Sequence, residues 1–172
     1  MENTIIPPLT QLSNGVLVPT EELIITIHDT IIRYRKELGK EDPSAIRNRG
    51  IISYVCDILK DRPHKYKKDA LENALYVATE VFYYIACQHP FVEGNKSTAY
   101  VTALFILYSN IGNNQQLISN NEEIRFVFQH NKEDLLAAPK EAEEITRLAE
   151  AGKDESELKR LIKEFLYKSI KV

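Results

Sequence analysis

The segment Gln88–Tyr100, which reads QHPFVEGNKSTAY, decides the fold because it separates two long apolar segments. It gathers His, Phe, Glu, Gly, Asn and Lys within eight residues, in a chain that has only six glycines. Pro90 disfavours the α conformation at the residue before it, so a helix that enters this segment has to end near His89. The pattern therefore predicts a loop between two helices that brings reactive side chains together.

Helical periodicity extends outward from this loop in both directions. Apolar residues recur at helical spacing over residues 69–88, and the segment 97–110 is apolar on nearly every side. A helix that is hydrophobic all round is typical of the centre of a domain. Further helices are expected over residues 21–39 and 51–59. Two or three more are expected after residue 114, split near Ala138-Pro139, and the last segment, 140–172, is charged and amphipathic. The predicted fold class is therefore all-α.

The 172 residues are expected to form one domain, because a chain of this length can bury a substantial hydrophobic core. Residues 1–19 read as a proline-punctuated N-terminal arm with a turn at residues 13–15, and Thr20 is suited to cap the helix that follows. Residues 139–172 read as a charged C-terminal helical extension. The helical bundle leaves room for one small β-hairpin flap at most, in the loop around residues 44–49.

Composition argues against several classes of function. The formal net charge of −3 and the pI near 5.9 argue against a nucleic-acid partner. No stretch approaches about 18 uninterrupted apolar residues, so no membrane span is expected, and the N-terminal residues lack the pattern of a signal peptide. Cys56 and Cys87 lie in apolar helical segments and are expected to be buried free thiols. These features favour a cytoplasmic protein.

The glycine of the loop and its neighbours suit an anion. Gly94 and Asn95 arrive at the start of the second helix, where N–H groups without helical acceptors and the helix dipole attract negative charge. Gly94 allows the backbone to approach a phosphate closely, and Lys96 adds a positive charge. For any one of these residues the simpler alternative is a plain connector, in which Lys96 is solvated.

The remaining side chains of the loop suit transfer from a magnesium–nucleotide complex. Glu93 offers the hard oxygen that Mg²⁺ prefers, and His89 carries the imidazole that serves as a general base near neutral pH. Phe91 is expected to anchor the loop between the helices. The alternatives are a capping role for His89 and a zinc site that it would share with Glu93. The zinc site needs a continuous helix, which Pro90 and Gly94 interrupt.

The motif HPFVEGNK closely resembles the signature of the Fic/Doc family, HxFx(D/E)GN followed by Gly or Lys, and it lies in the expected place between two helices. The similarity extends to LVPTEELIITIHDTIIRY, to the later IRNRGII and to the apolar segments on both sides of the motif. It covers roughly residues 16–130. The resemblance implies the helical Fic fold, with the motif loop between its two central helices.

The family's motif residues have roles that the resemblance carries to this chain. His89 would be the base that activates a Ser, Thr or Tyr hydroxyl of a protein substrate, and Glu93 would bind Mg²⁺. Lysine at the next variable position resembles the Doc branch, which transfers the γ-phosphoryl group of ATP, whereas most Fic proteins have glycine there and transfer AMP. The residues that would bind ATP are Gly94, Asn95, Lys96 and Ser97.

One residue departs clearly from the family pattern. The family places arginine where this chain has Ser97, and many members have a second arginine where it has Tyr100. Serine cannot pair with phosphate oxygens in the bidentate way of a guanidinium. A third alternative is therefore a degenerate nucleotide-binding or interaction module. Arg47, Arg49 and Lys65 are candidates to supply the missing charge, although each is more simply read as a solvated loop residue.

Two further segments bear on regulation and packing. The adjacent pair His28-Asp29 is read as packing and capping, because neighbouring residues on a helix face different directions. Fic proteins are often inhibited by a helix with the pattern (S/T)xxxE(G/N). The nearest match is TRLAEAG over residues 146–152, read here as an ordinary solvated face, and SNNEEI over residues 119–124 is poorer. Doc-type members are instead held inactive by a separate antitoxin chain, and the sequence leaves this partner and a homo-oligomer open.

Overall fold

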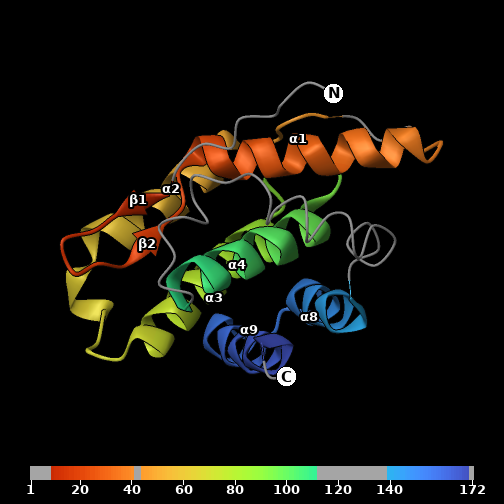
Figure 1. Cartoon of the computed structure of the whole chain (residues 1–172). Coiled ribbons are helices and arrows are strands. Elements are labelled where there is room, and N and C mark those ends of the chain that lie inside the picture. The colour runs from red at the N-terminus through yellow and green to blue at the C-terminus, as the bar shows by residue number, and fades with distance from the viewer. Residues whose placement is uncertain (1–8, 41–43, 112–138, 171–172) are drawn as a thin grey trace.

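The computed structural model describes residues 9–40, 44–111 and 139–170. Within these ranges the chain forms six α-helices, a 3₁₀ turn and one two-stranded sheet, which confirms the predicted all-α class (Figure 1). None of these helices is long and apolar enough to cross a membrane. In chain order the elements are β1 (Thr10–Gln11), β2 (Leu17–Val18), α1 (Glu21–Glu37), α2 (Arg49–Asp61), η1 (Pro63–Lys65), α3 (Ala70–Gln88), α4 (Asn95–Ile111), α8 (Lys140–Glu150) and α9 (Glu155–Ile170).

The helix boundaries follow from local capping. Thr20 caps α1 as expected, since its hydroxyl oxygen accepts a hydrogen bond of 3.1 Å from the N–H of Leu23. Asp69 caps α3 in the same way. α2 begins earlier than predicted because the side chain of Asn48 accepts a hydrogen bond from the N–H of Gly50 and caps the helix there. Side-chain caps of this kind typically stabilise a helix by about 1 kcal/mol.

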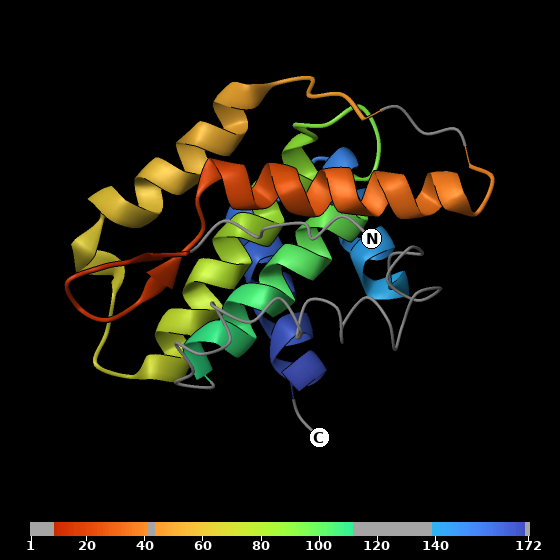
Figure 2. The ribbon, with the colours of Figure 1, turned by 45° about the horizontal axis from the view of Figure 1, so that its top comes forward.

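α3 and α4 form the central layer of the bundle. In Figure 1, α1 lies on one side of this pair and α8 and α9 lie on the other. Figure 2, in which the top comes forward, agrees: α1 crosses in front of α3 and α4, and the C-terminal helices lie behind them. α4 is buried around most of its circumference, which confirms its predicted place at the centre. Its fully buried residues are Ser97, Thr98, Ala99, Thr102, Ala103, Ile106 and Leu107.

The small sheet does not lie where the sequence placed it. The hairpin belongs to the N-terminal arm, where β1 pairs antiparallel with β2 around the predicted turn at residues 13–15. The side-chain amide of Asn110, at the end of α4, accepts from the N–H of Leu17 at 2.9 Å and donates to its carbonyl oxygen at 3.0 Å. Residues 44–49 form a single bridge to the motif segment instead of a hairpin, because their backbone partners lie in that segment.

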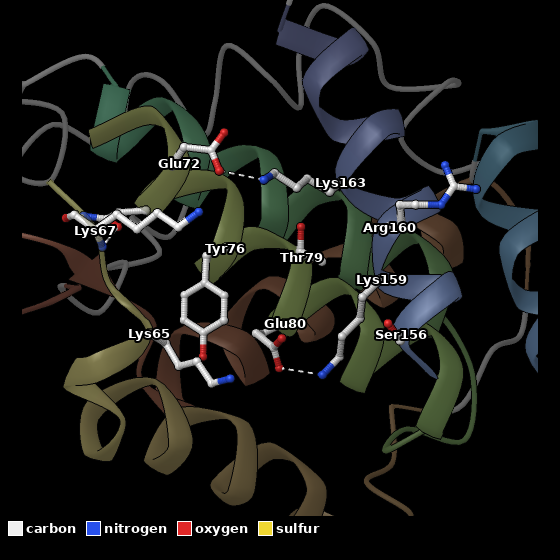
Figure 3. A pocket seen from close by; sticks show the side chains of 11 residues that line it. Lys65, Lys67, Glu72, Tyr76, Thr79, Glu80, Ser156, Lys159, Arg160 and Lys163 are labelled. Atoms are coloured by element: carbon white, nitrogen blue, oxygen red, sulfur yellow. Dashed lines mark hydrogen bonds and ion pairs between the residues drawn. The ribbon is translucent and has the colours of Figure 1, made fainter. Parts of the chain in front are cut away.

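α9 is attached to α3 by paired charges. Lys159 Nζ lies 2.9 Å from Glu80 Oε2, and Lys163 Nζ lies 2.6 Å from Glu72 Oε2 (Figure 3). These pairs line a cleft of about 350 Å³. None of the residues that line it belongs to the loop between α3 and α4. The charged C-terminal segment therefore packs onto the bundle through complementary side chains.

Candidate functional site

The motif loop, residues 89–94, joins α3 to α4 as the sequence predicted. α3 ends at Gln88, and His89 follows in the left-handed conformation, with φ 50° and ψ 61°. His89 is the one non-glycine residue with positive φ in the part of the chain that the structure describes. Such a conformation costs about 1–2 kcal/mol and persists only where the surroundings hold it. Backbone strain of this kind concentrates at functional sites.

Asn95 closes the motif loop from inside. Its side-chain oxygen accepts a hydrogen bond from the N–H of Phe91, and its amide donates to the Phe91 carbonyl oxygen, both at 2.9 Å. Phe91 is fully buried, as expected of an anchor. The amide of Asn95 is therefore used to shape the loop. What Asn95 offers an anion is therefore its main-chain N–H, in the first turn of α4.

His28 fixes the motif loop from α1. The fully buried ring stacks on Phe91, with the ring centroids 3.7 Å apart and the planes 4° from parallel. Nε2 lies 2.9 Å from the carbonyl oxygen of Glu93. Because a carbonyl oxygen can only accept, Nε2 carries the proton and donates it. His28 is thus a packing residue, as predicted, and it also positions the loop, which the sequence did not indicate.

A third segment holds the motif loop through its backbone. The N–H groups of Arg47 and Asn48 both donate to the Pro90 carbonyl oxygen, at 2.7 and 2.9 Å, and the N–H of Val92 donates to Ala45 at 3.0 Å. Three parts of the chain therefore fix the loop: α1, this segment and the first residue of α4.

Glu93 and Lys96 complete the predicted set. The Glu93 side chain is exposed, and Lys96 is half-buried on the first turn of α4. Among the described residues, no three His, Cys, Asp or Glu side chains gather as a ready-made metal site. Magnesium that accompanies a nucleotide takes one or two carboxylates and fills its remaining positions with phosphate oxygens and water. One accessible carboxylate beside a helix N-terminus fits that requirement.

Ser97, where the family pattern has arginine, contacts an arginine from another helix. The serine is fully buried, and its Oγ accepts a hydrogen bond of 2.9 Å from Nη2 of Arg35, on α1. Nη1 of the same guanidinium lies 3.7 Å from the point that a β-carbon would occupy at Gly94. The guanidinium of Arg35 therefore lies beside the motif loop and the start of α4. The sequence pattern does not indicate a role for this residue.

The other cations that were candidates to supply the missing charge, Arg47, Arg49 and Lys65, have other contacts in the structure. Arg49 is exposed and lies 3.2 Å from Glu21, at the start of α1. Lys65 lines the cleft between α3 and α9 (Figure 3). Arg47 is exposed and reaches the motif loop through its backbone. These placements agree with the simpler interpretation of all three as solvated residues.

α8 approaches the motif loop from the side opposite α1. Oε1 of Glu150, at the end of α8, lies 3.9 Å from Nε2 of His89. Thr146 is buried, with 4% exposure, and donates a hydrogen bond to Ala142 at 2.8 Å. The interpretation of this segment as an ordinary solvated face is therefore wrong for Thr146, which packs into the bundle because its helix face meets α3 and α4. Arg147 and Glu150 are exposed, as that interpretation expected. The alternative segment 119–124 lies outside the described residues.

Two residues near the loop have structural roles. Tyr100, where many family members have a second arginine, stacks on Phe165 of α9 with the ring centroids 5.7 Å apart. Cys87, two residues before His89, is a free thiol, and burial raises its pKa to about 12. A thiol with this pKa stays neutral near pH 7, so it does not compete with a substrate hydroxyl as a nucleophile.

The fold and the site together define a class: helical domains that carry an HxFxEGN loop between their two central helices, with the glycine and asparagine at the start of the second. A comparison with protein families matches residues 18–107, just over half of the chain, to the Fic/DOC family. The chain belongs to this family. Its members modify proteins by nucleotide-dependent transfer, generally with ATP and a metal ion, and are often controlled by antitoxins.

A search of curated proteins and a search of solved structures gave no match. The family match covers α1, α2, α3 and most of α4. It therefore includes both the motif loop and the two helices that flank it.

Proposed function

We propose that the protein transfers the γ-phosphoryl group of Mg-ATP to a hydroxyl group of another protein. His89 acts as the general base and Glu93 as the magnesium ligand. The nucleotide phosphates are bound by Gly94, Asn95, Lys96 and Ser97.

The presence of Lys96 is the observation that favours phosphoryl transfer over AMP transfer. It stands in the first turn of α4, beside the N–H groups that would bind phosphate, where most Fic proteins have glycine. A lysine side chain occupies part of the usual phosphate cradle and favours the reversed nucleotide orientation of the Doc branch. With the nucleotide reversed, the γ-phosphoryl group rather than the α-phosphoryl group faces the base.

The proposed reaction is an in-line displacement. The substrate hydroxyl oxygen forms a bond to the γ-phosphorus, the bond from that phosphorus to the β–γ bridging oxygen breaks, and ADP leaves. His89 takes the proton of the hydroxyl. The positive charge of Lys96 and the N-terminus of α4 stabilise the charge on the phosphate oxygens. Magnesium, when bound, neutralises charge on the same oxygens.

Labelled ATP tests the proposal. The protein is incubated with a cell lysate and either γ-labelled or α-labelled ATP, with His89→Ala as the control. Label on protein from the γ position alone is expected. Label from the α position would replace phosphoryl transfer with AMP transfer, and labelling that survives His89→Ala would overturn the assignment of the base.

Ser97 supports a second candidate, in which the domain binds nucleotide without transferring it and acts as a regulatory or interaction module. Loss of one well-placed donor of transition-state charge typically costs about 10²–10³ in rate. Calorimetric titration with Mg-ATP separates the candidates: binding without labelling in any lysate favours the module.

The proposed substrate is a Ser, Thr or Tyr hydroxyl on a second protein, and a separate antitoxin chain is the proposed regulator. The two free thiols of the described chain suit a reducing compartment, so we place the reaction in the cytoplasm. Co-expression with a candidate antitoxin should suppress the labelling. Labelling that is unchanged by every neighbouring small protein would argue against this form of control.

A further inference from the structure

We propose that Arg35, on α1, supplies the guanidinium that binds the nucleotide phosphates in place of the arginine that Ser97 replaces. The inference rests on the proposed nucleotide site and names a phosphate-binding residue that lies outside the motif. In this proposal position 97 holds serine where the family pattern has arginine, and α1 supplies a guanidinium beside that position instead.

One face of α1 is directed at the site. His28, Ile32 and Arg35 are spaced by four and then three residues, so they lie on the same side of the helix. His28 bonds to the carbonyl oxygen of Glu93, and the Cδ1 atom of Ile32 lies 3.2 Å from the β-carbon position of Gly94. α1 therefore follows the motif loop for two helical turns, and Arg35 continues that row.

The contact at the end of the row orients the guanidinium. Nη2 donates to Ser97 Oγ at 2.9 Å, while Nη1 lies 3.7 Å from the β-carbon position of Gly94. Gly94 has φ +80° and precedes α4, so its backbone lies where a phosphate would approach the helix N-terminus. Arginine presents five N–H donors in a planar fork, and Ser97 holds one of them, on Nη2.

Serine is the suitable neighbour for this arginine. Its hydroxyl is small and neutral, and it accepts a hydrogen bond from the guanidinium. An arginine at position 97 would add a second guanidinium to the region that already holds Arg35 and Lys96. Like charges that lie close together repel, and the repulsion is stronger where water is partly excluded. Arginine at position 35 and arginine at position 97 are therefore alternatives.

The other group of cations does not compete for this role. Lys159 and Lys163 of the cleft between α3 and α9 are each held by a glutamate (Figure 3). Within the described ranges, Arg35 is the guanidinium that bonds to Ser97 and lies 3.7 Å from the β-carbon position of Gly94.

Calorimetric titration of the full-length protein with Mg-ATP and with magnesium tripolyphosphate tests the proposal without relying on activity. Arg35→Gln should weaken binding of both ligands about ten- to a hundredfold, the range for loss of a charged hydrogen bond. The matched control is Lys36→Gln, which removes one exposed cation from the adjacent position of α1. It should change either affinity by less than about threefold, the range for a rim charge.

Moving the arginine back tests the exchange directly. The double variant Arg35→Gln/Ser97→Arg should recover most of the affinity lost in Arg35→Gln. If Arg35→Gln does not fold, as judged by its thermal unfolding, Arg35→Met keeps an unbranched stem without the charge and takes its place in both comparisons.

The outcomes separate this inference from the proposed function. Equal affinities in the Arg35 and Lys36 variants, with clear binding by the natural chain, would overturn the role of Arg35 and leave the nucleotide site in place. Absence of binding by the natural chain to both ligands at millimolar concentration would overturn the nucleotide site itself, and the role of Arg35 with it.

Discussion

Two helices reach the motif loop from opposite sides of the central pair, and they do so differently. α1 uses buried groups: His28 is fully buried, and Arg35 bonds to the fully buried Ser97. α8 uses Glu150, whose side chain is 66% exposed and lies 3.9 Å from His89. An exposed pair of this kind contributes at most about 1 kcal/mol. The α1 side is therefore part of the architecture of the site, whereas the α8 contact can be made and broken at little cost.

The largest effect on protein labelling is expected at His89, the residue that Glu150 of α8 faces. His89→Ala should lower protein labelling about 10²–10⁴-fold, because the substrate hydroxyl would lose its proposed base. The measurement is labelling from γ-labelled ATP at saturating concentration. The affinity for Mg-ATP, measured by calorimetry, should stay within a few-fold. A variant that lost binding and labelling together would show that His89 belongs to the architecture as well.

His28→Ala should be the most destabilising change on the α1 side. It opens a cavity against Phe91 and leaves the Glu93 carbonyl oxygen without its donor, so the free energy of unfolding should fall by about 2–4 kcal/mol. Urea denaturation measures it. The matched control is His64→Ala on η1, an exposed position that should change stability by less than about 0.5 kcal/mol. Similar losses in both variants would contradict the structural role given to α1.

Gly94→Ala and Gly152→Ala form a matched pair. Both glycines have positive φ, +80° and +83°, so both variants carry the same backbone strain. A β-carbon at Gly94 would lie 3.2 Å from Ile32 Cδ1, whereas at Gly152 no atom of the described residues lies within 4 Å of that position. We expect Gly94→Ala to be the more destabilising by about 1–3 kcal/mol, the cost of overpacking. Equal losses of unfolding free energy in urea denaturation would mean that the Ile32 side chain of α1 moves aside and relieves the contact.

The smallest effect is expected on the α8 side. Glu150→Gln removes the carboxylate that faces His89 and should raise the labelling rate by no more than about fivefold, in line with an exposed ion pair. The free energy of unfolding should change by less than about 0.5 kcal/mol. Glu143→Gln, another exposed position on α8, is the control and should leave the rate unchanged. A reduced rate in Glu150→Gln would show that the carboxylate assists His89.

Local features could be predicted from the sequence because their causes are local. Thr20 marks the start of α1 because its capping bond reaches only three residues along the chain. Pro90 marks the end of α3 because it restricts the residue directly before it. The order of residues in HPFVEGN likewise defines the motif loop, because all of its members lie in one segment. The burial of Thr146 could also have been predicted, since Ala142, Ile145 and Thr146 share one helical face.

Contacts between distant segments could not be predicted in this way. His28 is separated by 65 residues from Glu93, and Arg35 by 62 residues from Ser97. Their periodicity shows which face of α1 they share, but not which loop that face meets. The same holds for the sheet, because the strand residues in the N-terminal arm give no sign that Asn110 at the far end of α4 holds them.

The attachments of the motif loop have an energetic consequence for any ligand. A flexible segment has to be ordered when it binds, at a cost in conformational entropy of about 1–2 kcal/mol for each residue. In this protein the backbone of residues 90–93 is already fixed by bonds to Asn95, to His28 and to residues 45–48. That entropy is lost when the chain folds, so the binding energy of a ligand at this loop would be left available for affinity and orientation rather than for shaping the loop.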